Sequence, residues 1–82
     1  MKEYVTTNLD LAAVLLSLGF TDIGFSNIGS KRVEIKFDWD ERIPTAEREY
    51  WNGNLAIEPR LLLTNRKSLK GRIHDVSLNE SV

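Results

Sequence analysis

The chain has 82 residues, and its 11 basic and 12 acidic side chains leave a formal net charge of −1. A chain of this length forms one small domain. It is too short to be a two-domain enzyme that encloses a cofactor in a cleft. It has no cysteine and a single histidine, so a disulfide framework and a thiolate metal site are excluded. We therefore expect neither a metal nor a cofactor.

The composition also limits the partners and the location. The sequence pI of about 5.8 argues against recognition of nucleic acid by the charge of the whole molecule. No apolar run reaches the roughly 18 residues that span a bilayer. The first residues, Met1 to Tyr4, lack the basic and apolar regions of a signal peptide. We expect a cytoplasmic protein with no membrane partner.

The first predicted elements are a strand over residues 4–7 and a helix over residues 9–18. Thr7 is the expected N-cap of this helix. The helix is apolar almost all the way round, which indicates that it is central in the fold or part of an oligomer contact. Gly19 is placed for the left-handed residue that ends a helix, with Phe20 folding back onto the last turn.

A β-hairpin follows, with its turn at residues 27–30. Ile23 and Phe25 begin an alternating pattern before the turn. In the second strand the apolar positions are Val33, Ile35, Phe37 and Trp39. The positions between them are Arg32, Glu34, Lys36 and Asp38. The pattern predicts one buried face and one solvated face, on which alternating charges serve cross-strand pairing and solubility.

From Asp40 the period becomes helical. Ile43, Ala46 and Tyr50 share one face of a second helix, which Asn52-Gly53 ends. A connector at 54–58 leads to a third helix that begins at Pro59. The apolar stripe of this helix is Leu62, Leu69, Ile73 and Val76.

The elements together predict an α+β fold. Their order is β-α-β-β-α-α, in a single domain over residues 1–82. We expect a three-stranded, mainly antiparallel sheet with the helices packed on one face. The ordered core is expected at about residues 3–76, and residues 77–82 should form a frayed tail.

The basic residues gather in the last helix. Residues 1–58 contain 6 basic and 10 acidic side chains, a balance of −4, whereas residues 59–82 contain 5 and 2, a balance of +3. On a helical wheel, four side chains fall within about 80° of one another, opposite the apolar stripe. They are Arg60, Lys67, Lys70 and His74. This face can bind the phosphates of a nucleic acid or an acidic partner surface, or it is simply the solvated side of the helix. Arg66 and Arg72 flank the stripe.

Catalytic patterns are weak. Asp75 cannot orient His74, because successive side chains of a helix diverge. Asp38, Asp40 and Glu41 are equally well explained by a strand that ends just before a helix. We expect no catalytic residue and no enzyme activity.

Trp51 is the best anchor for a protein contact. It lies about 100° from Tyr50 on the second helix and is therefore harder to bury. The alternative is that the 54–58 connector partly covers it.

Several motifs together resemble a known family. They are Tyr4-Val5-Thr6-Thr7, Leu9-x-Leu11-Ala12-Ala13-x-Leu15, Gly19, Val33-x-Ile35-x-Phe37, Tyr50-Trp51-Asn52-Gly53, Pro59-Arg60 and Leu69-Lys70-x-Arg72-Ile73. Their order and spacing over residues 4–74 are similar to those of short bacterial and phage-encoded domains of unknown function. The resemblance implies one compact α+β domain, encoded by a phage or mobile element, and no activity or cofactor. Ile43-Pro44 departs from the pattern early in the second helix.

Three functional hypotheses remain open. The first is a non-enzymatic interaction module that binds a host or viral macromolecule, a host or phage protein foremost, in the host cytoplasm. The second is a small nucleic-acid-binding protein that uses the last helix. The third is a homo-oligomeric or virion-associated subunit that uses the first helix.

Overall fold

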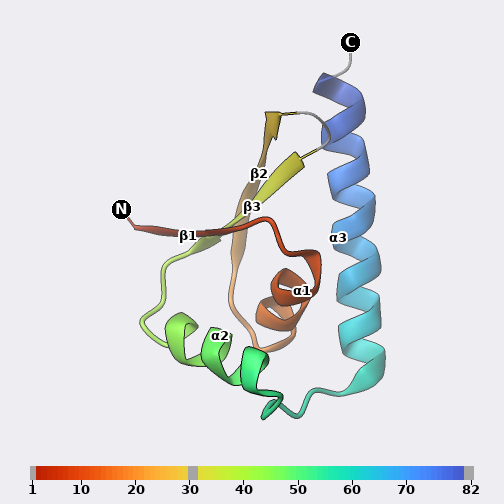
Figure 1. Ribbon diagram of the computed structural model, residues 1–82. Helices are drawn as coiled ribbons and strands as arrows, with labels where there is room; N and C mark the ends of the chain where they lie inside the picture. The colour runs from red at the N-terminus through yellow and green to blue at the C-terminus, as the bar shows by residue number, and fades with distance from the viewer. Residues whose placement is uncertain (1, 30–31, 81–82) are drawn as a thin grey trace.

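The computed structural model describes residues 2–29 and 32–80. The elements in chain order are β1 (Glu3–Thr6), α1 (Leu9–Ser17), β2 (Asp22–Gly29), β3 (Arg32–Asp38), α2 (Ile43–Asn52) and α3 (Pro59–Glu80). The three strands form one antiparallel sheet in the order β1-β3-β2 (Figure 1). This confirms the predicted α+β fold and the β-α-β-β-α-α order. Ser30 of the predicted hairpin turn lies outside the described residues, as do 81–82 of the predicted tail, while α3 continues to Glu80.

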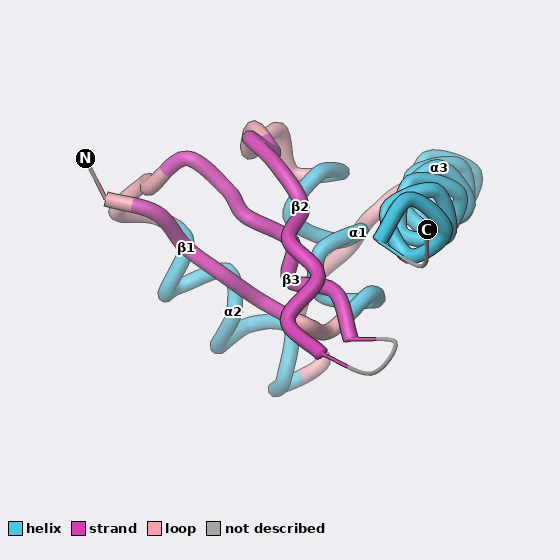
Figure 2. Tube along the Cα trace, turned by 90° about the horizontal axis from the view of Figure 1, so that it is seen from above, coloured by secondary structure: helices cyan, strands magenta, loops and turns pink. Residues whose placement is uncertain are grey.

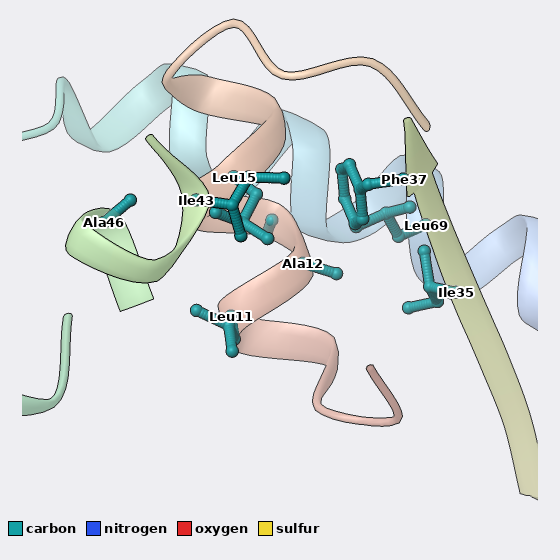
Figure 3. Packing of buried hydrophobic residues seen from close by; sticks show 9 residues of the cluster. Leu11, Ala12, Leu15, Ile35, Phe37, Ile43, Ala46 and Leu69 are labelled. Carbon is teal, nitrogen blue, oxygen red and sulfur yellow. The ribbon is translucent and has the colours of Figure 1, made fainter. Parts of the chain in front are cut away.

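The core lies between the sheet and the helices. Five consecutive residues of α1, from Leu11 to Leu15, are buried, and α1 packs against α2, α3 and β1. Ala12 and Ala13 are fully buried, and such small side chains let a helix approach its neighbours closely. The remaining buried residues among those described are Val33, Ile35, Phe37, Ile43, Ala46 and Leu69. All of them except Val33 belong to the core cluster that Figure 3 shows. Seen from above, α3 stands beside α1 and β2 (Figure 2). The first helix is therefore central, as its all-round apolar pattern predicts.

The helix ends follow local signals. Gly19 and Gly53 both have positive φ values, 98° and 72°, which glycine adopts without steric cost. The Phe20 N–H donates to the Leu15 carbonyl, so the chain folds back as predicted. The predicted N-cap of α1 is wrong by one residue. Asn8 rather than Thr7 caps the helix, because its Oδ1 accepts the Leu11 N–H at 3.0 Å.

Two hydrophobic residues of the hairpin, Trp39 and Ile23, are more exposed than their place in the alternating pattern predicts. Trp39 does not complete the buried row, because β3 ends at Asp38 and the alternation ends with it. Trp39 is 37% exposed, with the Lys2 ammonium 5.1 Å from its ring centroid. Ile23 lies at a shift in the β2–β3 register and is 45% exposed. The buried row of β3 is therefore limited to Val33, Ile35 and Phe37.

A polar contact ties β1 to α2. The Tyr4 hydroxyl donates a hydrogen bond to Oε2 of Glu47. Partial burial of the phenol raises the pKa of Tyr4 above its usual value of 10.0, and the hydrogen bond and the charge of Glu47 raise this pKa further. The neutral phenol is thus the form that the fold stabilises.

Alkaline pH should weaken the fold through this contact. Below about pH 10, Tyr4 is neutral in both states and the contact contributes fully. Above that value the unfolded chain releases a proton that the folded chain retains, so the free energy of unfolding falls as pH rises. We expect urea unfolding midpoints to drop between about pH 9 and pH 11. Tyr4→Phe should show a shallower drop, and an unchanged pH dependence in this variant would contradict the assignment.

Candidate functional site

The outer face of α3 carries the residues singled out from the sequence. The opposite side of the helix holds it in place, with Leu69 fully buried and Leu62 and Ile73 partly buried against the core. Asn65 adds a polar contact, because its Nδ2 donates to Oγ of Ser17 on α1 at 3.0 Å. The orientation of α3 about its axis is therefore fixed.

The two arginines that flank the apolar stripe are used inside the molecule. Nε of Arg66 lies 2.6 Å from Oδ1 of Asp10 on α1. Nη1 of Arg72 lies 2.7 Å from Oδ2 of Asp22 on β2, and its guanidinium lies 4.8 Å from the ring centroid of Phe25. These contacts attach α3 to its neighbours, so the two arginines have acidic partners within the molecule.

The other four basic residues of α3 form no such contacts within the described chain. Arg60, Lys67, Lys70 and His74 are all exposed. No side chain among the described residues forms a salt bridge with any of them. We call these four residues, together with Leu63, the basic face. Leu63 lies within the same arc of the helix and is 65% exposed. From Arg60 to His74 the face extends about 21 Å along the helix axis.

Trp51 is open to solvent as well. It is 64% exposed, and its ring meets Tyr50 in an edge-to-face contact with a centroid distance of 4.9 Å. Tyr50 is partly buried and lines a small hollow of about 230 Å³ with Leu55 and Leu62. The connector therefore leaves most of Trp51 uncovered.

A groove between the end of α1 and α2 was not predicted. It has a volume of about 460 Å³. Its lining includes four apolar residues, Leu18, Phe20, Ala46 and Leu55, which we call its floor. The other lining residues are Glu41, Arg42, Thr45 and Glu49. We call it the acidic groove. No local sequence signal reveals it, because its residues come from three separate segments.

Arg42, the one arginine that lines this groove, already forms a salt bridge. Its Nε and Nη2 donate to the two carboxylate oxygens of Asp40 at 3.0 and 2.8 Å. These bonds, with one from the Arg42 backbone N–H, lower the pKa of Asp40 to about 2. The charges of Arg42 and Asp40 thus cancel. The carboxylates of Glu41 and Glu49 leave the groove with a net negative charge.

The positions considered for chemistry do not assemble into a reactive cluster among the described residues. Asp40 pairs with Arg42, and Asp38 and His74 are exposed. No group of three histidine or acidic side chains within the described chain is placed to hold a metal ion. None of the helices in the described ranges combines the length and apolar character needed to cross a bilayer.

Comparison with known proteins gives one match. The model of a family described as a domain of unknown function (DUF5659) matches residues 1–75. No curated protein and no solved structure matches the chain.

Proposed function

Because the chain belongs to the DUF5659 family of domains of unknown function, we propose a role from its surface: a non-enzymatic module that binds an acidic protein through the basic face. One observation carries this proposal. The five arginines and lysines of α3 divide into two that are paired within the molecule and three, Arg60, Lys67 and Lys70, that have no described acidic partner. Unpaired charges aligned on one rigid helix attract a surface of opposite sign.

The apolar residue within the basic face favours a protein partner over a nucleic acid. Leu63 is 65% exposed between Arg60 and Lys67. A solvent-exposed leucine surrounded by charges matches the usual anatomy of a protein interface, in which an apolar centre has a polar rim. The net charge of −1 also gives no general attraction to phosphates. Trp51, at 64% exposed, is a second candidate anchor.

The proposed setting is a phage or mobile element, and the partner is a host or phage protein in the cytoplasm of the host cell. The resemblance of the motifs over residues 4–74 to short phage-encoded domains supports this setting. The small size of the domain supports binding by an open surface rather than by an enclosed cleft.

Site-specific photo-crosslinking in living cells tests the proposal. With a photoreactive amino acid in place of Leu63, we expect a crosslinked product that contains a second protein. Lys67→Glu with Lys70→Glu should lower its yield by about ten-fold or more, because attraction at two contacts becomes repulsion. The same amino acid at Arg48, which is exposed on α2, should give no such product.

The outcome also decides between partner classes. The absence of a protein product at position 63, or a yield that the two charge reversals leave unchanged, would overturn the proposal. Binding to duplex or single-stranded oligonucleotides that weakens with salt and is lost in the reversed variant would assign the basic face to nucleic acid instead. A product of only twice the 9.4 kDa chain mass would indicate self-association rather than a partner.

A further inference from the structure

The acidic groove and the basic face carry charges of opposite sign beside exposed apolar side chains. The floor of the groove includes Leu18, which is 39% exposed, and Glu41 and Glu49 also line the groove. The basic face has Leu63 between Arg60 and Lys67, which lie three residues before and four residues after it. Residues at these spacings are neighbours on a helix surface. One surface therefore presents an apolar side chain between two cations, and the other combines apolar side chains with two carboxylates.

The charge of the groove is only partly cancelled from within. Arg42, its one cation, already binds Asp40 through two hydrogen bonds. The three carboxylates of Asp40, Glu41 and Glu49 against one guanidinium leave a balance of −2. Neither Glu41 nor Glu49 forms a salt bridge with another described residue. A partner surface that carries cations can neutralise these carboxylates while it covers the apolar floor.

We propose that a second copy of this chain occupies the groove, with the basic face of its α3 placed so that Leu63 covers the floor and Lys67 and Arg60 approach Glu41 and Glu49. Complementary charge on the two surfaces of one chain is the reason to choose a second copy over another partner. Groove and face are different patches, so this is a heterologous contact. A groove of about 460 Å³ covers a small area, so the association is weak and depends on salt.

Self-association through the groove does not require the acidic protein partner proposed above, but it regulates access to the same basic face. A basic face held in the groove of another copy is covered and cannot bind an acidic protein at the same time. A high local concentration of the protein therefore reduces binding of the acidic partner. Binding of that partner in turn dissociates the self-associated form.

Sedimentation equilibrium of the purified protein tests the contact. The mean mass should rise above the 9.4 kDa of one chain as the concentration approaches about 1 mM at low salt. It should return to one chain near 1 M salt, where the screening length is about 3 Å. A monomer at all concentrations in low salt would overturn the inference.

Charge reversal identifies the two surfaces. Glu41→Lys with Glu49→Lys makes the groove basic, and Lys67→Glu with Lys70→Glu makes the face acidic. Each double variant alone should associate about ten-fold more weakly than the unaltered chain, because like charges then meet. An equimolar mixture should associate again, since each groove then meets a face of opposite sign. A mixture that remains monomeric would overturn the pairing.

A matched control separates the two patches from net charge. Glu3→Lys with Glu34→Lys makes the same charge change as the groove variant, on the strands β1 and β3. This control should associate as the unaltered chain does, and its loss of association would contradict the assignment to the groove. Leu63→Asn should weaken association while leaving the charges intact. The groove variant should keep the crosslink to a protein partner at position 63, which distinguishes failure of this inference from failure of the proposed function.

Discussion

Replacing Phe37 by alanine should lower the free energy of unfolding by about 3–5 kcal/mol. Phe37 is the largest of the fully buried side chains and lies on the central strand β3, between Tyr4 on β1 and Asp22 on β2 in the register. Its ring packs within the core cluster shared by the sheet and all three helices (Figure 3). A cavity at this position removes contacts from several elements at once. Urea unfolding followed by circular dichroism measures the loss.

The effect should be large relative to the whole stability of the domain. A small domain has a free energy of unfolding near the lower end of the usual range of about 5–15 kcal/mol, so this variant should be partly unfolded at 37 °C. Val5→Ala is the matched control, because Val5 is 40% exposed on the neighbouring strand β1. It should change the stability by about 0.5 kcal/mol or less. Similar losses for both variants would contradict the placement of the core.

Most of the fold follows from signals between residues close in sequence. The all-round apolar character of residues 9–18 predicts a central helix, and Leu11 to Leu15 are indeed buried. The predicted helix stops at Gly19 and Gly53 are confirmed by their positive φ values. Such signals depend on backbone conformation and on the spacing of apolar residues, which the sequence displays directly.

The differences arise where the outcome depends on distant segments. Trp39 continues the alternation of β3 in sequence, but the strand ends at Asp38 and Trp39 is 37% exposed. Ile23 also fits the alternation, and an irregularity in the register exposes it. A periodic pattern cannot reveal the end of a ladder or a bulge, because both are set by the partner strand.

The same distinction applies to the candidate site. Helical spacing places Arg60, Lys67, Lys70 and His74 on one side of α3, and all four are exposed in the structure. The sequence does not show that Asp10 and Asp22, far away in the chain, pair with Arg66 and Arg72. Those tertiary pairs are what distinguish the cations that hold the helix from the cations that face solvent.

Replacing Leu69 by alanine should destabilise the protein by about 2–5 kcal/mol. Leu69 is fully buried and belongs to the core cluster with Phe37 and Leu15. It is also the one residue of α3 whose side chain is completely enclosed among those described. Its truncation leaves a cavity at the contact of α3 with the rest of the fold. Thermal unfolding should show a lower midpoint, and hydrogen exchange should show faster opening of α3.

Leu63→Ala makes the same chemical change on the opposite side of the same helix. Leu63 is 65% exposed, so its truncation should change the free energy of unfolding by about 0.5 kcal/mol or less. If both variants lost stability equally, the rotation of α3 about its axis would be different from that described. If only Leu69→Ala does so, the fold does not require an apolar side chain at position 63. A loss of self-association in Leu63 variants then reports on binding alone, because the domain that carries the basic face is intact.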